Sequence, residues 1–446
     1  AKHLTEFKKY WGESAEYRNL LIYKDPAINS ETIDISQGFL ISDIIRQCED
    51  AINSTEQYSD IIITAPTGAG KSLFFQIPGI YLHNQYNALT LVVTPLIALM
   101  RDQVLELEER GIDFATYINS EITYEQRQSR LEGIKAGHYS IVYLSPELLL
   151  ANDIRSIIGE RQLALVVVDE AHLVTSWGRD FRVDYWFLGD YLEKIRRAQY
   201  YQSKHFESLR FPILCLTATA VFGGRDDVVG ELQNSLNLNC SAEHLYIGYV
   251  RRDNISFDIR QASKKKNTRK EDKVNWTCQR ISEFCENKQK AIVYFPYIAQ
   301  IDDVHKEILA NYPQCRSYVE QYSGGMDKFE KNEAYENFRY RRVSTMLATK
   351  AFGMGINIPD VDVVYHYAPT GTLADYVQEI GRAARTLDKG HAKTDHMPND
   401  MQYAKTLWGL SGLRHYQIKA MMKKLYDLYS MKKHRNLLIS PDVFGY

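Results

Sequence analysis

The sequence Ala65-Pro66-Thr67-Gly68-Ala69-Gly70-Lys71-Ser72 decides the fold of this chain. It stands between a short run of β-branched residues, 61–64, and an apolar pattern of helical spacing from Ser72 to about Tyr81. A strand, a glycine-rich turn and a helix in this order form a phosphate-binding loop. The residues follow the pattern of that loop except that Ala65 replaces its first glycine. The strand and the helix on either side argue against a simple glycine-rich turn.

Each residue type in this loop has a chemical reason. Gly68 and Gly70 allow backbone N–H groups to close around phosphate oxygens without interference from a Cβ atom. The helix that begins near Lys71 directs the positive end of its dipole at the phosphates. We expect Lys71 to bind the β- and γ-phosphates and Ser72 to give an oxygen ligand to Mg²⁺. The predicted cofactor-binding residues of the loop are Thr67, Gly68, Ala69, Gly70, Lys71 and Ser72.

Two carboxylates follow a second buried strand further along the chain. Asp169-Glu170-Ala171-His172 comes directly after the apolar run 165–168. Ligands bind at the carboxyl ends of buried parallel strands in α/β folds. We therefore expect Asp169 to hold Mg²⁺, directly or through water, and Glu170 to orient and deprotonate the attacking water. The pair alone is weak evidence, but with the phosphate-binding loop upstream it predicts a site for ATP hydrolysis.

The composition is that of an ordinary globular protein. The chain has 446 residues, of which 45% are hydrophobic and 25% charged. At roughly 100–200 residues per domain, this length predicts two to four domains. The proportions exclude a disordered chain, a collagen-like chain and a disulfide-stapled mini-domain. The six cysteines form no Cys-x-x-Cys pair, and a reducing cytoplasm fits them best. We expect no membrane span, because no apolar run approaches about 18 residues.

Charge is distributed unevenly along the chain. Residues 1–250 carry 22 Lys and Arg against 33 Asp and Glu, a net charge of −11, whereas 251–446 carry 32 against 23, a net charge of +9. The most basic stretch lies between 401 and 435. Such asymmetry is a hint of polyanion binding, and a solvated helical face explains it equally well on charge alone.

Apolar runs and helical patterns alternate along the sequence. Continuous apolar strands separated by helices are typical of a parallel sheet that is covered on both faces. A polar and basic stretch, 263–270, divides two series of strands, and we place a linker near 245–275. The predicted strands are 61–64, 91–94, 141–144, 165–168 and 213–216 in the first series, and 291–294, 345–348 and 363–366 in the second.

The Asp-Glu-Ala-His motif and its surroundings resemble the RecQ-like DNA helicases, a branch of the DEAH-type superfamily 2 helicases. The similarity extends from about Gln37 to Arg385 and is carried by blocks at 94–104, 143–147, 169–185, 216–220, 251–255, 348–357 and 378–385. It implies an α/β fold of two tandem RecA-like domains with parallel sheets, 1–245 and 246–390. A short, basic, helical C-terminal segment, 391–446, would follow them.

The resemblance implies that ATP lies between the two domains. The first domain would supply Lys71, Ser72, Asp169 and Glu170. A guanidinium from the opposite domain stabilises transition-state charge only when the cleft is closed, so hydrolysis becomes conditional on domain position. The second domain would supply two such arginine fingers, Arg382 and Arg385.

Three further roles follow from the same resemblance. Gln37 would read the adenine edge, and an exposed loop glutamine is the alternative because a polar insert at 49–59 lengthens its spacing to Lys71. Gly355, in the block 348–357, joins the cofactor-binding residues. Thr217-Ala218-Thr219 would connect the ATP site to domain movement, with His172 as a coupling residue rather than a metal ligand.

The resemblance also implies contacts to DNA. The segment 177–182 is similar to the aromatic-rich loop of the family, which links DNA contact to hydrolysis, although the family usually has histidine where Arg179 stands. Its aromatic rings can stack on bases and its arginines can bind phosphates, whereas a core position for Trp177 and Phe181 is the alternative. Hydroxyl groups near strand ends can bind the phosphate backbone of DNA and position it without reading the base sequence. The predicted DNA contacts are Thr94, Arg101, Ser145, Trp177, Arg179, Phe181, Arg182 and Thr349.

The sequence departs from the family beyond the motor. No cysteine follows Cys315, so the zinc site that RecQ-like enzymes commonly carry there has no ligands, and we expect no zinc in this chain. The stretch 390–400 lacks the apolar strand that the family pattern leads us to expect. We also find no room for a winged-helix domain after 390.

The resemblance therefore implies a helicase that uses ATP and Mg²⁺ and moves 3′ to 5′ on DNA that is single-stranded or has a single-stranded tail. Protein partners in a larger complex are expected, a membrane is not, and the location is the cytoplasm with the nucleoid, or a nucleus. The alternatives are a duplex-DNA translocase in a defence or repair complex, an RNA helicase, and a scaffold without turnover. The block 352–355 argues against the RNA helicase, and intact Lys71, Glu170 and Arg385 argue against the scaffold.

Overall fold

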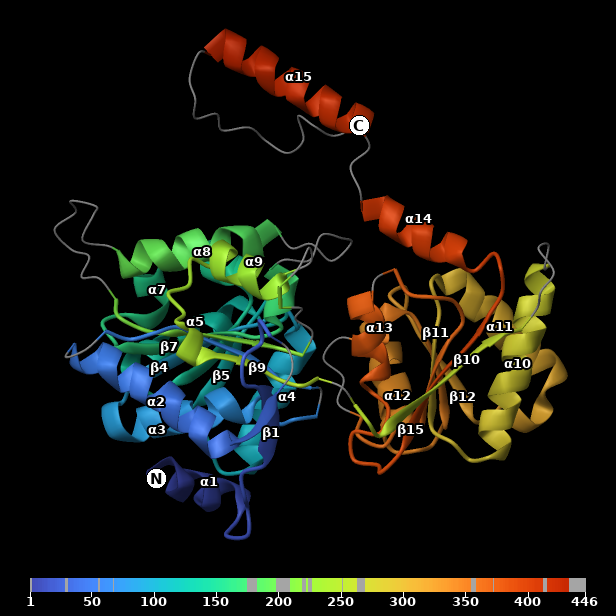
Figure 1. The fold of residues 1–446 in the computed structure, drawn as a ribbon, viewed down its shortest axis with the longest axis horizontal. Helices are drawn as coiled ribbons and strands as arrows, with labels where there is room; N and C mark the ends of the chain where they lie inside the picture. The colour runs from blue at the N-terminus through green and yellow to red at the C-terminus, as the bar shows by residue number, and fades with distance from the viewer. Residues whose placement is uncertain are drawn as a thin grey trace.

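A computed structural model of the chain shows two α/β domains side by side, the N-terminal half on the left of Figure 1 and the C-terminal half on the right. All structural statements concern the residues that it describes, which are 2–28, 31–54, 57–66, 68–174, 183–197, 209–218, 222–223, 227–250, 252–262, 269–353, 358–371, 373–411 and 415–432.

The first domain is built on a seven-stranded sheet in the order β5-β6-β4-β7-β8-β3-β9. Every described pairing in it is parallel, as continuous apolar strands predict. The strands are β3 (Ile61–Thr64), β4 (Leu89–Val93), β5 (Ala115–Ile118), β6 (Ile141–Leu144), β7 (Leu163–Val168), β8 (Ile213–Thr217) and β9 (Leu245–Ile247).

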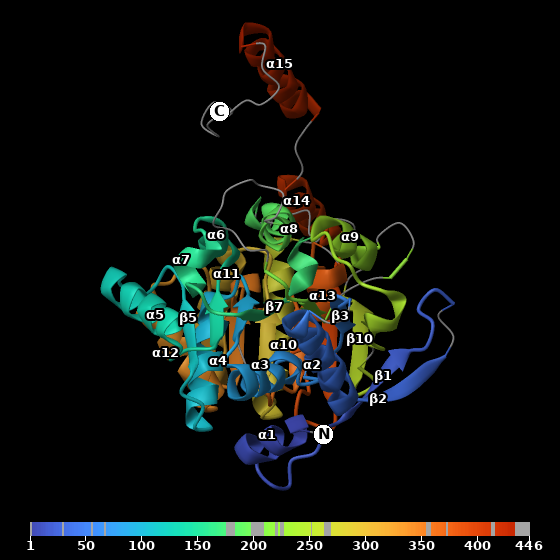
Figure 2. The same ribbon diagram turned by 90° about the vertical axis from the view of Figure 1, so that its left-hand side faces the viewer.

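Helices cover both faces of this sheet. The first four contribute to one apolar core and the others to a second core on the opposite face. The first group is α1 (Lys2–Trp11), α2 (Gln37–Asn53), α3 (Leu73–Tyr86) and α4 (Ile97–Glu109). The second is α5 (Tyr124–Ala136), α6 (Pro146–Leu150), α7 (Ile154–Ile158), α8 (Val183–Arg196) and α9 (Val228–Ser235). Figure 2 shows α1 at one end of this domain, beside a hairpin of β1 (Asn19–Tyr23) and β2 (Thr32–Ser36).

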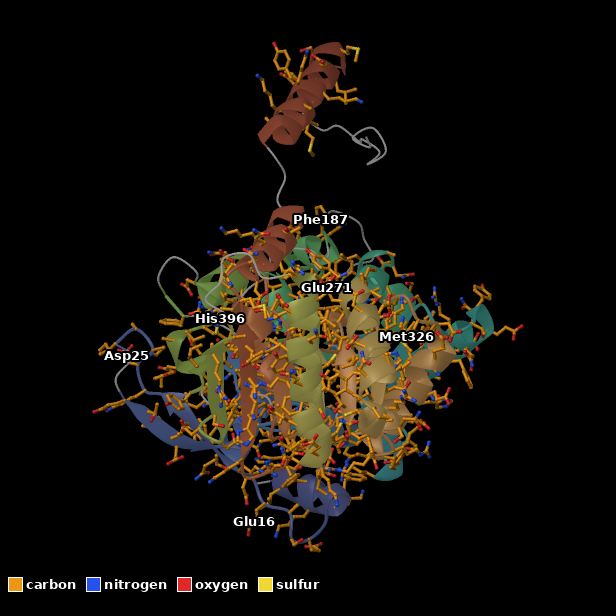
Figure 3. The ribbon with its side chains drawn as sticks, turned by 90° about the vertical axis from the view of Figure 1, so that its right-hand side faces the viewer. Glu16, Asp25, Phe187, Glu271, Met326 and His396 are labelled. Carbon is orange, nitrogen blue, oxygen red and sulfur yellow. The ribbon has the colours of Figure 1, made fainter. Side chains whose placement is uncertain are left out.

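The second domain has a six-stranded parallel sheet in the order β10-β15-β14-β11-β13-β12. Its strands are β10 (Ile255–Gln261), β11 (Ala291–Tyr294), β12 (Val319–Tyr322), β13 (Thr345–Ala348), β14 (Val363–His366) and β15 (Gly390–His396). One face packs against α10 (Lys270–Glu286) and α11 (Ile298–Asn311), and the other against α12 (Lys328–Arg339) and α13 (Leu373–Ile380). The outer side of α10 faces the viewer in Figure 3, with Glu271 labelled near its start.

The structure corrects the expected ends of both domains. The stretch 390–400 contains a strand, because β15 pairs with both β14 and β10. A boundary after residue 390 would cut this strand, and a boundary after residue 245 would cut β9. The predicted linker near 245–275 contains β9 and β10, which belong to different sheets. Only 248–254 therefore lies between the two sheets.

Two helices follow the second domain, α14 (Met401–Ser411) and α15 (His415–Lys432). The ring of Tyr403 on α14 lies 6.0 Å from that of Tyr297 and 6.5 Å from that of Tyr367, so α14 contacts the second domain. Figure 1 shows α15 well apart from both domains. Among the described helices, none is both long enough and apolar enough to cross a membrane.

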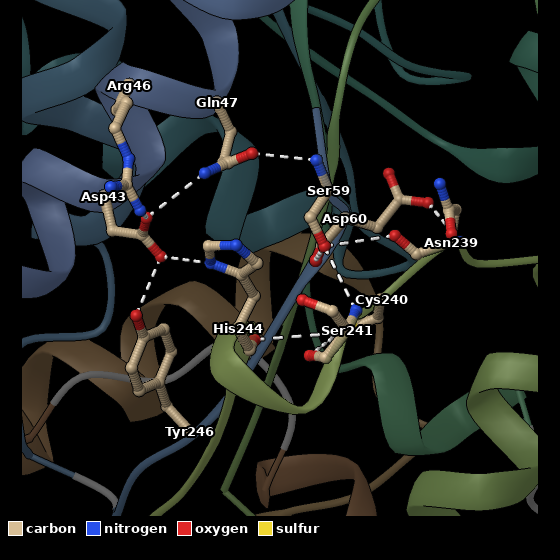
Figure 4. A network of polar contacts seen from close by, with 10 residues as sticks. All are labelled: Asp43, Arg46, Gln47, Ser59, Asp60, Asn239, Cys240, Ser241, His244 and Tyr246. Atoms are coloured by element: carbon tan, nitrogen blue, oxygen red, sulfur yellow. Dashed lines mark hydrogen bonds and ion pairs between the residues drawn. The ribbon is translucent and has the colours of Figure 1, made fainter. Parts of the chain in front are cut away.

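Buried polar networks join the ends of the first sheet to its helices (Figure 4). Asp43 of α2 accepts a hydrogen bond from the hydroxyl of Tyr246 at 2.7 Å and lies 2.7 Å from Nδ1 of His244. Asp60, only 1% exposed, accepts from both terminal nitrogens of Arg196 and from the backbone N–H groups of Ile213 and Asn239. A single carboxylate therefore connects the start of β3 with α8 and β8.

Replacing Asp60 should destabilise the first domain strongly. Asp60→Ala leaves a mostly buried guanidinium and two N–H groups without their acceptor, which we expect to cost about 3–5 kcal/mol of unfolding free energy. Urea denaturation followed by circular dichroism measures the loss. The matched control is Glu31→Ala, which breaks the exposed Lys24–Glu31 pair and should cost no more than about 1 kcal/mol. Equal midpoints for the two variants would contradict the assigned role of Asp60.

Candidate nucleotide site between the two domains

The phosphate-binding loop lies between β3 and α3, as the sequence predicts. Gly68 has a φ of 86° and Gly70 a φ of 71°, a backbone conformation that favours glycine. The N–H of Ala65 donates to the carbonyl of Thr217 at 3.1 Å, so the start of the loop is fixed to β8. Ser72 caps α3 without using its side chain for a capping hydrogen bond.

Gln37 is the first residue of α2, and its side chain is held against this loop. Its Nε2 donates to the carbonyl of Ala69 at 2.8 Å, and its Oε1 accepts from the N–H of Arg18 at 2.9 Å. The side chain is 1% exposed, so the alternative of an exposed loop glutamine is wrong. Whether its amide reads adenine stays a prediction.

Asp169 and Glu170 follow β7 at the carboxyl edge of the sheet. The N–H of Asp169 donates to the carbonyl of Val93 at 3.0 Å, and the N–H of Glu170 donates to the Asp169 carboxylate at 2.9 Å. Glu170 has a φ of 49°, a conformation that non-glycine residues adopt mainly where the surroundings impose it. The chain therefore turns sharply between the two carboxylates.

The two carboxylates have different electrostatic surroundings. Burial and the neighbouring charge of Glu170 raise the pKa of Asp169, although Lys71 opposes them. Burial alone would also raise the pKa of Glu170, but the cations around it win and lower it. These cations are Lys71, Arg382 and Arg385, and the neighbouring His172 acts in the same direction. Glu170 is therefore held in the ionised form, which can accept a proton.

His172 connects this site to the end of β8. Its Nδ1 lies 3.0 Å from the hydroxyl of Thr217 and 3.4 Å from the Glu170 carboxylate. Burial lowers its pKa, which favours the neutral imidazole. The contact agrees with a coupling role for His172 and Thr217, and that role stays a prediction.

The second domain presents its two predicted fingers in the turn after α13. Arg382 is 6% exposed, and burial together with the charge of Arg382 lowers the pKa of Arg385 to about 10. Ala384, between them, has a φ of 48°, and its N–H donates to the carbonyl of Val361 at 2.8 Å. The positive charges of both arginines lower the pKa of Glu170 in the first domain, so the two halves of the predicted site influence each other electrostatically.

Sequence reasoning missed the pair that holds α13 in place. Nε2 of His366, at the end of β14, lies 2.7 Å from the Glu379 carboxylate, and both side chains are buried. The ring of His366 also lies 4.9 Å from that of Tyr376. Glu379 stands in the block 378–385, but nothing in the sequence pairs this helical residue with one at the end of a strand.

The predicted DNA contacts that the structure describes differ in exposure. Arg101 on α4 is exposed and Thr349, after β13, is partly exposed. Thr94 is 1% exposed, and Ser145 accepts a capping hydrogen bond from the N–H of Leu148. Other predicted site residues lie outside the described residues, namely Thr67, Trp177, Arg179, Phe181, Arg182 and Gly355.

Comparison with known proteins supports a helicase with two RecA-like domains. The DEAD/DEAH box helicase family model matches residues 46–224, and the helicase conserved C-terminal domain model matches 272–386. The probable ATP-dependent DNA helicase RecS of Bacillus subtilis is 32% identical over 338 residues, which are 76% of this chain and 61% of RecS. The chain belongs to the RecQ-like superfamily 2 helicases. The resemblance drawn from the motifs is thereby confirmed.

Two further comparisons concern the length and the fold of this RecQ-like chain. The ATP-dependent helicase SGS1 of Saccharomyces cerevisiae is 28% identical over 435 residues, 96% of this chain but 26% of SGS1. The chain thus spans less than two thirds of the curated relatives it is compared with here. The structure of Mss116p bound to ssRNA and AMP-PNP has a TM-score of 0.61 at 17% identity, over 88% of this chain and 80% of that one. It confirms the fold of two RecA-like domains.

Proposed function

We propose that this chain is the motor of an ATP-dependent DNA helicase that moves 3′ to 5′ along single-stranded DNA. The observation that carries the proposal is that positive charges from both domains, Lys71 of the first and Arg382 and Arg385 of the second, lower the pKa of Glu170. A hydrolytic carboxylate surrounded by cations from both domains makes hydrolysis depend on their closure. The DNA helicase activity in the name of RecS supports DNA as the substrate.

The residues at the phosphate-binding loop suit a nucleoside triphosphate and Mg²⁺. Asp169 presents a partly buried carboxylate at the end of β7, and the hydroxyl of Ser72 is not used to cap α3. Oxygen ligands of this kind, one or two from the protein and the rest from phosphates and water, are the set that Mg²⁺ prefers. When bound there, the ion neutralises charge on the β- and γ-phosphates.

The protein side chains divide the rest of the chemistry. Lys71 and the N–H groups of the loop hold the phosphates, and Gln37 stabilises the loop from behind through the carbonyl of Ala69. Glu170 orients the attacking water and accepts its proton. Arg382 and Arg385 stabilise the charge that develops on the γ-phosphoryl group. The contact between His172 and Thr217 gives the site a connection to the end of β8.

We place the DNA along the carboxyl ends of the strands in both sheets. Arg101 follows β4 in the first domain, and Thr349 follows β13 in the second. Contacts of this type bind the phosphate backbone and are independent of sequence. The proposal includes a location with the cell's DNA, in the cytoplasm with the nucleoid or in a nucleus, and protein partners in a larger complex.

The test is the steady-state ATPase rate without nucleic acid and with single-stranded DNA, duplex DNA or RNA, at one stated salt concentration. We expect single-stranded DNA to raise kcat at least about tenfold and duplex DNA and RNA to raise it less. Strand separation on substrates with a 3′ or a 5′ tail then gives the direction.

Each other outcome contradicts a defined part of the proposal. Stimulation mainly by duplex DNA would favour the duplex translocase, and stimulation mainly by RNA would favour the RNA helicase. Unwinding that needs a 5′ tail would overturn the direction. The control is Lys71→Ala, which removes the phosphate-binding cation and should abolish the rate under every condition.

A further inference from the structure

The chain between the two sheets makes hydrogen bonds to the turn that carries the arginine fingers. Nη1 of Arg252 donates to the carbonyl of Gly381 at 3.3 Å. Nη2 of the same side chain donates to the carbonyls of Ala383 at 3.1 Å and Ala384 at 2.6 Å. One guanidinium therefore connects three backbone carbonyls in and around the segment from Arg382 to Arg385.

Asn254 strengthens this contact from the same segment. Its Oδ1 accepts from Nε of Arg252 at 3.1 Å, which orients the plane of the guanidinium. Its Nδ2 donates to the carbonyls of Ala384 at 3.1 Å and Leu387 at 3.3 Å. We call Arg252 and Asn254 together the linker clamp. The clamp gives the carbonyl of Ala384 two donors, at a residue whose φ of 48° the surroundings must impose.

The other end of the segment is attached to the phosphate-binding side. The N–H of Gly248 donates to the carbonyl of Thr64 at 3.1 Å and to its hydroxyl at 2.7 Å. Thr64 is the last residue of β3 and stands directly before the phosphate-binding loop. A Cβ atom at Gly248 would lie 2.2 Å from that carbonyl oxygen, so the close approach requires glycine.

We propose that Arg252 and Asn254 are positioning residues for ATP hydrolysis, which set Arg382 and Arg385 according to the conformation of the segment between the domains. Residues 248–254 join a strand of the first sheet to a strand of the second, so a change in domain orientation must alter their backbone torsions. The linker clamp transmits that change to the turn that carries Arg382 and Arg385. The proposal rests on the finger role assigned under the proposed function.

The experiment is a double-mutant cycle on kcat of the DNA-stimulated ATPase. Arg252→Ala should lower kcat about 10- to 100-fold and leave the Kd of a fluorescent ATP analogue within about twofold, because the phosphate-binding loop is intact. Arg252→Lys should not restore kcat, since an ammonium group cannot reproduce a planar fork that reaches three carbonyls. Asn254→Ala should lower kcat about three- to tenfold.

The cycle separates positioning from a general effect on stability. In a variant that already carries both Arg382→Ala and Arg385→Ala, Arg252→Ala should lower kcat by less than about twofold further, because the two fingers that it would displace are absent. Multiplicative losses would mean a merely structural role and would overturn the proposal. If Arg252→Ala does not fold, the same cycle with Asn254→Ala decides.

The control is Arg260→Ala, at the nearby strand β10, where the guanidinium is exposed and pairs with Asp258 of its own strand. It should leave kcat and Kd within about twofold. Unchanged kcat in both Arg382→Ala and Arg385→Ala would remove the finger role itself, and the inference with it. A large loss in Arg385→Ala with none in Arg252→Ala and Asn254→Ala would overturn the linker clamp alone.

Discussion

Glu170→Gln should lower kcat for ATP hydrolysis by about 100- to 10,000-fold while ATP still binds, because it removes the group that accepts the proton of the attacking water. The side chain keeps its size, and Lys71 keeps its place at the phosphates. The cations around Glu170 lower the pKa of the wild-type carboxyl, so the wild-type residue is ionised and competent at neutral pH. Steady-state hydrolysis with saturating DNA, and titration of a fluorescent ATP analogue, measure the two properties.

The matched control is Glu125→Gln, at an exposed position in the first turn of α5, which should leave both properties within about twofold. Hydrolysis by Glu170→Gln at the wild-type rate would show that another base serves the water. If the variant lost both ATP binding and hydrolysis, Glu170 would instead support the structure of the phosphate-binding loop and not act as the base. Strand separation by the variant without turnover would support a scaffold that needs only nucleotide binding.

Arg385→Ala should lower kcat about a thousandfold or more, because an arginine finger stabilises charge that appears mainly in the transition state. The Kd for nucleotide should change far less, since the loop of the first domain binds the ground state by itself. The positive charges of Arg382 and Arg385 both lower the pKa of Glu170 across the domain boundary. Arg382→Ala should therefore produce a loss of the same kind, measured in the same ATPase assay.

Arg385→Lys tests whether charge alone is sufficient. Lysine keeps the positive charge but not the planar fork, and we expect it to recover less than about a tenth of the lost rate. The control is Arg316→Ala, an exposed arginine of the second domain whose Nη2 donates to the carbonyl of Ala310. A wild-type kcat in both Arg382→Ala and Arg385→Ala would mean that the second domain contributes no catalytic charge.

Buried parallel strands were predictable because both of their faces are covered. The runs 61–64, 141–144 and 291–294 agree with strands whose four residues are all buried. The strands that the sequence did not reveal are shorter, more polar or at sheet edges. β12 is an edge strand in which buried and exposed side chains do not alternate. β15 lies inside the sheet but carries the polar residues His391, Lys393 and His396. Such strands are stabilised by their neighbours' hydrogen bonds rather than by a continuous apolar run.

The sequence by itself determined the phosphate-binding loop, the Asp-Glu-Ala-His carboxylates and the family, because local residue types and their order carry that chemistry. Only the tertiary structure decided which distant groups meet. It brought the charges of Arg382 and Arg385 close enough to lower the pKa of Glu170, paired His366 with Glu379, and turned Arg252 onto the carbonyls of the turn that carries the two arginines. Backbone carbonyls have no signature in a sequence, and contacts across two sheets depend on how the strands are ordered. These groups come together only when both domains are folded.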